Sequence, residues 1–321
     1  MPMERGSGAA TEKRVVLLKP RGFCAGVVRA IDVVRLALER YGASIYVRKE
    51  IVHNRHVVEE LRRAGAVFVE ELEEVPAGAR VIFSAHGVAP EVRDEAERRG
   101  LEVIDATCPL VTKVHLEAMR AARQGCTIVL IGHRDHDEVI GTLGEAPECT
   151  VVVNSLAEVD LLEPPDPQRI RYITQTTLSL DETREIVARL KERFPAIQGP
   201  RAQDICYATQ NRQGAVKAAA ARCDLLLVVG SRNSSNSKRL VEVARRAGVR
   251  AHLVDDAAEV EAGWLEGAET VGVTAGASAP EHLVQELVWA LARHGFARVE
   301  ELDLGAEDVR FGLPSELGGR A

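Results

Sequence analysis

The sequence predicts an α/β fold divided into small modules, each built on its own parallel sheet. Short runs rich in β-branched residues alternate with amphipathic helical stretches almost from end to end of the 321 residues. This alternation is typical of parallel strands joined by helices. Eleven predicted strands would make one unusually wide sheet, and the chain exceeds the roughly 250 to 300 residues at which a single core stops growing. Two or three smaller sheets fit better.

The predicted strands are short apolar runs in which valine and isoleucine are frequent, and these side chains pack well on a pleated surface. In chain order they cover residues 15–19, 44–47, 67–69, 81–84, 102–105, 127–131, 150–153, 169–174, 224–229, 251–254 and 270–274. The clearest amphipathic helices lie between them, at residues 26–40, 54–63, 90–99, 111–123, 181–193, 211–221, 236–247 and 280–293.

Composition and charge exclude several classes of protein. The net charge is −7, and the charged residues, 28% of the chain, have both signs interspersed. A general nucleic-acid binder needs a basic stripe, which this sequence lacks. No stretch approaches the ~20 apolar residues of a membrane helix, and residues 1–13 lack the apolar core of a signal peptide. We therefore expect a cytoplasmic protein with no nucleic-acid or membrane partner.

The six cysteines fall into two groups by local context. Disulfide frameworks belong to small secreted domains, and none of the six stands in a CxxC or zinc-finger pattern. Three of them adjoin apolar runs, where burial as small hydrophobic residues is the natural interpretation: Cys126, Cys149 and Cys223. The other three lie in polar turns just before predicted helices, whose N-termini favour the metal-binding thiolate: Cys24, Cys108 and Cys206.

These last three cysteines form a faint internal repeat. The strings FCA, TCP and ICY are separated by 84 and 98 residues, about one small α/β module each, which favours three modules. Three thiolates from three modules could close on one metal centre. An iron–sulfur cluster held by three cysteines would keep one iron open for substrate. Three unrelated cysteines remain the alternative.

Polar residues gather where the predicted strands end, and ligands of parallel sheets bind outside these carboxyl ends. Four histidines lie in such turns: His53, His86, His133 and His136. Ser278 follows another strand. The turn GSRNSSNS at residues 230–237 contains Ser234, Ser235 and Asn236 and opens a helix, so its hydroxyls and N–H groups can bind phosphate. A capped helix with a Ser/Asn-rich turn is the simpler alternative.

Three carboxylates stand among these histidines: Asp135, Asp137 and Glu138. A carboxylate repels phosphate unless it carries a proton or faces another part of the ligand. Glu138 is therefore a candidate proton donor, and a carboxylate that merely stabilises a helix N-terminus is the equal alternative.

The turns taken together resemble one family. The matching strings are PRGFCAGVVRAI, EIVHN, FSAHGV, DATCPLVTKVH, GHRDHDEV, TQTTLS, DICYATQNRQ, VGSRNSSNSKRL and GVTAGASAPE, in unbroken order from about Val15 to about Ala290. They are similar to those of the 4-hydroxy-3-methylbut-2-enyl diphosphate reductases, also called the LytB or IspH family. This resemblance implies a monomer in which three α/β modules form a pseudo-threefold trefoil around a central cavity.

The resemblance also implies the site residues. A [4Fe-4S] cluster would have three cysteine ligands, Cys24, Cys108 and Cys206, and one open iron. Substrate-binding residues of the family match His53, His86, His136, Ser234, Ser235, Asn236 and Ser278. Its proton-relay residues match Glu138 and Thr176.

The implied reaction is the last step of the methylerythritol phosphate route to isoprenoids. (E)-4-hydroxy-3-methylbut-2-enyl diphosphate undergoes a two-electron reductive dehydroxylation to isopentenyl diphosphate and dimethylallyl diphosphate. Electrons would come from a small flavodoxin or ferredoxin. The sequence has no GxGxxG nucleotide motif, which agrees with electron supply through iron.

The sequence also indicates where the modules begin and end, and it departs from the family pattern in two places. We place the modules at residues 26–108, 109–202 and 203–295 with 14–25, and a C-terminal tail at 296–321. Residues 1–13 and the tail after Leu304 carry no motif and are expected to be peripheral. Ile140 stands where many relatives have Glu (EVIGT against EVEGT).

Two rival interpretations of the function remain. The first is a three-cysteine zinc protein or a non-redox phosphosugar enzyme. The second is a non-catalytic binding module that kept the fold.

Overall fold

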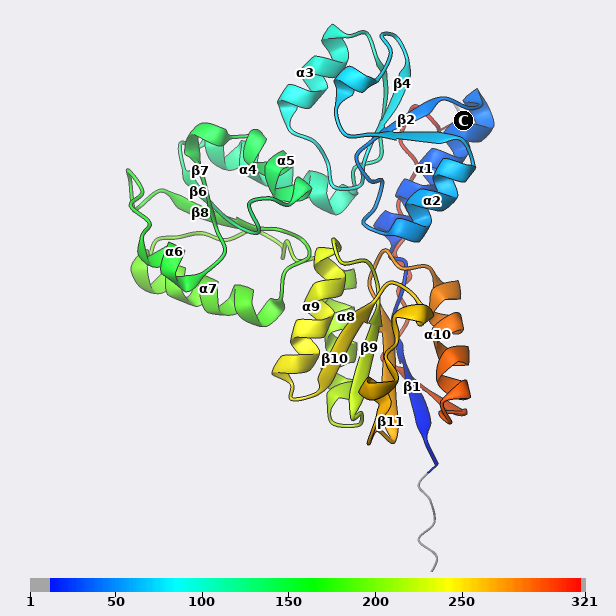
Figure 1. The fold of residues 1–321 in the computed structure, drawn as a ribbon. Coiled ribbons are helices and arrows are strands. Elements are labelled where there is room, and N and C mark those ends of the chain that lie inside the picture. The colour runs from blue at the N-terminus through cyan, green and yellow to red at the C-terminus, as the bar shows by residue number, and fades with distance from the viewer. Residues whose placement is uncertain (1–11, 319–321) are drawn as a thin grey trace, which may run out of the picture.

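The computed structural model describes residues 12–318 and contains three separate parallel sheets. Each sheet carries its own helices, and the resulting lobes meet at a common centre (Figure 1). The predicted fold class, three small parallel-sheet α/β modules, is confirmed.

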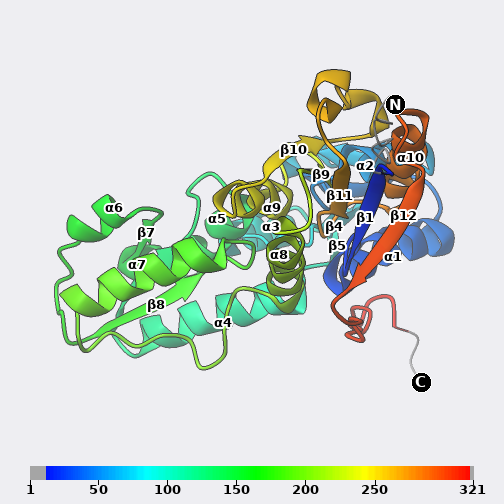
Figure 2. The same cartoon turned by 90° about the horizontal axis from the view of Figure 1, so that it is seen from below.

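The five-stranded sheet has the order β10-β9-β11-β1-β12 and joins the two ends of the described chain. Its strands are β1 (Arg14–Lys19), β9 (Leu225–Val229), β10 (Arg250–Val254), β11 (Thr270–Ala275) and β12 (Arg298–Asp303). Three helices belong to this module: α8 (Tyr207–Ala220), α9 (Ser235–Arg246) and α10 (Glu281–Arg293). Strand β1 pairs with both β11 and β12, and Figure 2 shows β1 and β12 side by side.

The four-stranded sheet has the order β3-β2-β4-β5. Its strands are β2 (Ile45–Arg48), β3 (Ala66–Val69), β4 (Arg80–Phe83) and β5 (Glu102–Asp105). Its helices are α1 (Ala25–Tyr41), α2 (Arg55–Arg63) and α3 (Pro90–Arg98). Helix α1 buries one apolar face, which includes Ile31 and Val34, against this sheet. It therefore crosses from β1 of one module into the core of another.

The three-stranded sheet has the order β7-β6-β8. Its strands are β6 (Thr127–Ile131), β7 (Thr150–Val153) and β8 (Ile170–Thr174). Its helices are α4 (Pro109–Arg123), α5 (Asp137–Gly144), α6 (Leu156–Asp160) and α7 (Leu180–Arg193). Single 3-10 turns elsewhere lie at Leu72–Glu74, Pro147–Cys149, Ala257–Glu259 and Ala262–Leu265.

The C-terminal segment differs from the expectation. Strand β12 was not predicted, because RVEELD carries no apolar run; the strand lies at an edge of the sheet and is mostly exposed. It lies inside the segment 296–321 that we expected to be a C-terminal tail. The expectation that residues after Leu304 are peripheral was wrong, since Leu317 is buried in the core beneath the four-stranded sheet. Residues 1–11, also expected to be peripheral, lie outside the described residues.

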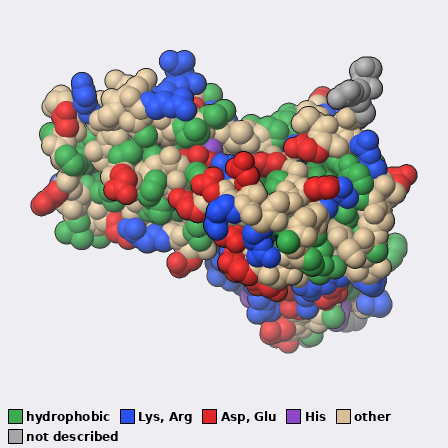
Figure 3. Space-filling view, turned by 90° about the horizontal axis from the view of Figure 1, so that it is seen from above, with side chains coloured by type: hydrophobic (Ala, Val, Ile, Leu, Met, Phe, Trp, Pro, Cys, Tyr) green, Lys and Arg blue, Asp and Glu red, His purple; other side chains and the backbone are tan. Residues whose placement is uncertain are grey.

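The surface is mixed in charge. Basic and acidic side chains alternate over the face drawn in Figure 3, without a basic stripe on that face. None of the helices within residues 12–318 is both long and apolar enough to span a membrane.

Candidate active site

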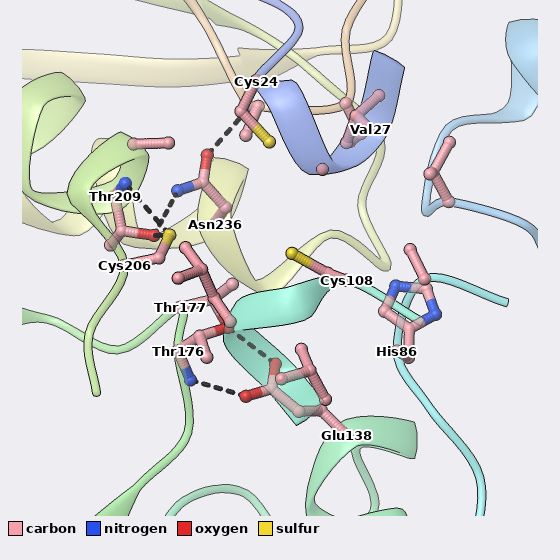
Figure 4. A pocket seen from close by; sticks show the side chains of 18 of the residues that line it. Cys24, Val27, His86, Cys108, Glu138, Thr176, Thr177, Cys206, Thr209 and Asn236 are labelled. Carbon is pink, nitrogen blue, oxygen red and sulfur yellow. Dashed lines mark hydrogen bonds between the residues drawn. The ribbon is translucent and has the colours of Figure 1, made fainter. Parts of the chain in front are cut away.

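The three cysteines singled out by the repeat occupy equivalent places. Cys24, Cys108 and Cys206 are the N-cap residues of α1, α4 and α8. All three line one cavity of about 110 Å³ where the modules meet. Figure 4 shows the three thiols pointing into this space from three different elements. The fold therefore brings together residues that are 84 and 98 positions apart in the chain.

Each cysteine is fixed through its backbone to the turn after a parallel strand. The cysteine N–H groups donate to carbonyls that follow β11, β4 and β8: Cys24 to Ala277 (3.1 Å), Cys108 to Ala85 (3.0 Å) and Cys206 to Thr176 (3.0 Å). These turns also carry predicted substrate-binding or proton-relay residues. The cysteines and the polar residues of the cavity are consequently positioned by the same hydrogen bonds.

The surroundings of the thiols fit a metal–sulfur group. A Cβ atom at Gly26 would lie 2.7 Å from Cys108 Sγ and 3.9 Å from Cys24 Sγ, so the missing side chain lets α1 approach both sulfurs. Cys206 Sγ accepts a hydrogen bond from the Thr209 backbone N–H (3.4 Å). Three convergent thiols are the soft donor set that iron–sulfur clusters use.

Burial raises the pKa of Cys108 to about 12 and that of Cys206 to about 11. Backbone N–H groups at the helix N-termini do lower the pKa of both thiols, as expected. Loss of hydration opposes the charged form more strongly than these N–H groups favour it. A bound metal centre would favour the thiolate form of both sulfurs.

Three histidines form a compact group on one side of the cavity. The rings of His53 and His86 stack with centroids 4.0 Å apart, and His136 meets them edge-on at 5.4 and 5.9 Å. Burial, followed by proximity of the other histidines, lowers the pKa of His86 well below 6.5 and that of His136 to about 4. The two neutral imidazoles can each offer one N–H to an anion.

The histidine group includes three possible metal ligands, but a nearby positive charge disfavours a metal ion there. His53, His86 and Asp137 have ligand atoms within 4.8 Å of one another. However, the Lys49 ammonium lies 2.5 Å from Asp137 Oδ1. A metal ion there would be repelled by Lys49, whereas an anion would be attracted to it.

His133 does not join this group, contrary to the expectation of four histidines in one wall. It lines a separate cavity with Asn154, Glu182 and Arg239. Gln175 Oε1 accepts its backbone N–H at 3.1 Å, and the chain then turns before His136 caps α5. Two histidines three positions apart in one turn thus face different spaces.

Hydroxyl and amide groups line the opposite side of the cavity. Ser234 caps α9 by accepting the Ser237 N–H (3.3 Å), and Ser235 Oγ accepts from Thr177 Oγ1 (3.0 Å). Asn236 Oδ1 accepts the Ala277 N–H at 2.9 Å. Ser278 Oγ donates to the His53 carbonyl at 2.9 Å, which connects the two sides. We call the three histidines and these four residues together the polar wall: His53, His86, His136, Ser234, Ser235, Asn236 and Ser278.

Glu138 lies in the first turn of α5 and is 2% exposed. Its Oε1 accepts the Thr176 N–H at 2.6 Å and its Oε2 accepts the Thr176 hydroxyl at 2.9 Å (Figure 4). Burial raises the pKa of Glu138 to about 7, although the two Thr176 hydrogen bonds lower it. This carboxyl can therefore carry a proton near neutral pH. The other two carboxylates differ, since Asp135 is exposed and Asp137 is paired with Lys49.

All twelve residues that the family resemblance assigned to the site line this cavity, whereas His133, Asp135 and Asp137 do not. Further residues line it as well, and Thr177, Thr209, Tyr207 and Phe311 among them were not proposed. Thr177 follows β8 in the string TQTTLS, so its position at a strand end could have indicated it. Phe311 lies in the tail, where no motif pointed to it. Ile140 is 45% exposed and is not among the lining residues.

The remaining cysteines pack against apolar cores. Cys223 is buried, and Cys126 and Cys149 are partly buried against the core of the three-stranded module. All six cysteines are free thiols. The predicted division into two groups of three agrees with these positions.

Comparisons with known proteins agree with this geometry. The profile of the family described as LytB protein matches residues 15–292. A protein of Nocardia farcinica named 4-hydroxy-3-methylbut-2-enyl diphosphate reductase is 59% identical over 310 residues, which are 96% of this chain and 92% of that protein. A protein of Tolumonas auensis with the same name is 55% identical over 95% of this chain and 99% of its own length.

A solved structure is similar throughout the fold. The E-1-hydroxy-2-methyl-but-2-enyl-4-diphosphate reductase of Plasmodium falciparum superposes with a TM-score of 0.92 at 40% identity, covering 95% of this chain and 97% of that one. A second solved structure, described as the terminal enzyme of the non-mevalonate pathway, has a TM-score of 0.62 at 30% identity and covers 88% of this chain and 99% of its own. The chain belongs to the LytB protein family.

Proposed function

We infer that this chain is a 4-hydroxy-3-methylbut-2-enyl diphosphate reductase. The reaction consumes two electrons and two protons, releases the allylic hydroxyl as water, and gives isopentenyl diphosphate or dimethylallyl diphosphate at the end of the methylerythritol phosphate pathway. The observation that carries this function is the single cavity that joins three N-cap thiols, a wall of anion-binding groups and a buried protonatable carboxyl.

Cys24, Cys108 and Cys206 would hold a [4Fe-4S] cluster through three thiolates. When bound, such a cluster supplies electrons and, at the iron without a cysteine, an open position for the substrate hydroxyl. The support is the convergence of three soft donors and the space that Gly26 provides beside two of them.

The polar wall would bind the diphosphate. Its serine hydroxyls, the Asn236 amide, the neutral imidazoles and the N-terminus of α9 offer hydrogen-bond donors without many formal charges. Lys49 adds a cation beside His86. The serines and Asn236 of the wall are buried and its three histidines are partly buried, which strengthens these contacts relative to water.

Glu138 and Thr176 would deliver a proton to the departing hydroxyl. The Glu138 carboxyl has a pKa of about 7, so a substantial fraction is protonated at neutral pH. Thr176 is hydrogen-bonded to it and lies beside the backbone of Cys206. The acid is thus held close to one of the proposed cluster ligands.

The oligomeric state, the electron donor, the compartment and the module limits are further parts of the proposal. We expect a monomer, since one chain contributes the three thiols, the polar wall and Glu138 to the same cavity. A small flavodoxin or ferredoxin would supply single electrons. Six free thiols fit a reducing compartment such as the cytoplasm.

The proposed module limits are 26–108, 109–202 and 203–295 with 14–25. They enclose all strands of the three sheets except β12, so we extend the third module to include that strand.

Anaerobic purification tests the function directly. The brown protein should contain iron and acid-labile sulfide, and with a chemical one-electron donor it should convert the hydroxylated substrate to the two diphosphate products. A colourless, air-stable protein with stoichiometric zinc would instead favour the rival zinc-protein interpretation.

A change in the polar wall should affect binding but not the cluster. His53→Ala and Ser234→Ala each remove a donor to the diphosphate, and each should weaken pyrophosphate binding by about 1 to 3 kcal/mol. Calorimetry or inhibition by pyrophosphate measures this effect, and the iron–sulfur absorption spectrum should stay unchanged.

Matched controls exist for both substitutions. His133→Ala removes a histidine that follows β6 but faces another cavity. Ser155→Ala removes a serine that caps α6 just as Ser234 caps α9. Both controls should retain normal pyrophosphate binding. Equal inhibition of wild type, His53→Ala and Ser234→Ala would place the diphosphate site elsewhere.

A further inference from the structure

Each helix that follows a cavity cysteine carries a cation at nearly the same place. Arg29 on α1 stands five residues after Cys24, Lys113 on α4 five residues after Cys108, and Arg212 on α8 six residues after Cys206. Each of them reaches the chain segment that leads into a different cavity cysteine.

Arg29 binds the segment before Cys108. Its Nη1 donates to the Thr107 carbonyl at 3.1 Å and its Nη2 to the Asp105 carbonyl at 3.4 Å. Arg29 is 9% exposed. The helix that begins at Cys24 therefore holds the turn of the next cysteine in the chain.

Lys113 binds the segment before Cys206. Its Nζ donates to the carbonyls of Ala202 (2.6 Å) and Gln203 (3.1 Å) and lies 2.9 Å from Asp204 Oδ1. The Asp204 side chain is fully buried, and its Oδ2 accepts the Thr174 N–H at 2.9 Å. The helix that begins at Cys108 thus fixes the approach to the third cysteine.

Arg212 closes the circle by binding the segment before Cys24. Its Nε and Nη2 donate to the Gly22 carbonyl at 3.2 and 2.7 Å, and the residue is completely buried. The helix that begins at Cys206 therefore holds the turn of the first cysteine. Three cations connect three cysteine turns in one closed ring.

The C-terminal segment after β12 contacts two of these three cations, Arg29 and Arg212. Arg29 Nε donates to the Gly312 carbonyl at 2.7 Å. Arg212 Nη1 lies 2.9 and 3.1 Å from the two carboxylate oxygens of Glu307. Phe311, between these two anchor points, lines the cavity. The segment after β12 therefore covers the cavity through contacts with the ring itself.

The charges of the three cations are balanced differently. Arg212 faces Glu307, and Lys113 faces Asp204 and Glu117. Arg29 donates to three carbonyls, and among residues 12–318 no carboxylate lies within 4.0 Å of its guanidinium. A buried charge with no counter-ion is costly. Thiolates at the neighbouring cavity would supply the missing negative charge.

We propose that Arg29, Lys113 and Arg212 form a ring of positioning residues that sets the spacing of the three cysteines, and that Arg29 also stabilises the negative charge of the cluster. The proposal rests on the proposed iron–sulfur function. A cation near a cluster favours its reduced, more negative state, so Arg29 raises the reduction potential. Lys113 and Arg212, neutralised by carboxylates, act mainly through geometry.

The test compares methionine variants, which keep most of the unbranched stem of the side chain and remove the charge and the hydrogen-bond donors. Arg29→Met, Lys113→Met and Arg212→Met, loaded anaerobically, should each release iron to a chelator about tenfold faster or more, because hydrogen bonds from charged groups are lost. Arg29→Met should also shift the cluster midpoint potential to more negative values. Arg29→Lys should keep the potential of wild type while still releasing iron faster, since one ammonium cannot hold three carbonyls.

A matched control separates the ring from general loss of stability. Arg193 binds the carbonyls of Val159 and Leu162 within the three-stranded module, away from the cavity. Arg193→Met should leave iron release and potential unchanged. If Met variants fail to fold, Arg29→Lys and Lys113→Arg carry the test, and both should release iron faster than wild type.

Two outcomes would overturn the proposal in distinguishable ways. Folded ring variants with the iron-release rate and potential of wild type would refute the ring and leave the proposed function intact. Wild-type protein that binds no iron and sulfide after anaerobic reconstitution would refute the proposed function, and the ring proposal with it.

Discussion

Replacing Cys24, Cys108 or Cys206 by serine should remove or severely reduce the brown chromophore. Each of these residues caps a different helix at the shared cavity, so no neighbouring thiol can take its place. A serine hydroxyl stays protonated where a cysteine can become a thiolate, and it binds iron poorly. Iron and sulfide analysis with the visible spectrum of anaerobic protein measures the effect.

The other three cysteines provide the control. Alanine at Cys126, Cys149 or Cys223 removes one sulfur atom from an apolar contact and should lower the free energy of unfolding by about 1 to 2 kcal/mol, with full iron content. A Cys206→Ser protein that retains the iron content of wild type would contradict the assignment of three ligands.

The parts of the site that the sequence predicted are those governed by local rules. A cysteine directly before a helix becomes its N-cap, and a polar turn after a parallel strand lies at the ligand-binding edge. These rules placed Ser234, Ser278 and Glu138 correctly at the cavity. The family resemblance added the choice among histidines that the local rules left open.

What the sequence could not predict depends on contacts between distant segments. His133 and His136 occupy the same turn, yet they line different cavities, which the sequence of the turn does not reveal. Strand β12 has an acidic sequence and is mostly exposed, and its partner, β1, lies at the other end of the described chain. Phe311 reaches the cavity because buried Arg29 and Arg212 hold the segment on either side of it.

Protonation of Glu138 should give the reaction a pH dependence. Burial places the pKa of this carboxyl at about 7, above its ordinary value of 4.5. If the protonated form is the acid, turnover should be constant at lower pH and should decline as pH rises through about 7.

The same proton should make the stability of the fold depend on pH, because the folded state binds it more tightly than the unfolded chain does. Its contribution to stability is therefore complete below pH 4.5 and disappears as pH rises through 7.

Glu138→Gln should lower turnover by about 10² to 10⁴-fold, the usual cost of losing a general acid. Glutamine preserves the shape and can still accept the Thr176 N–H, so iron content, substrate binding and the cluster spectrum should remain normal. The decline in stability between pH 4.5 and 7 should vanish as well, which reports on the proton independently of activity. Thr176→Val should reduce turnover less, because water can replace a hydroxyl that only relays a proton. Wild-type turnover by Glu138→Gln, measured with excess chemical electron donor, would mean that the proton comes from the diphosphate, a histidine or water.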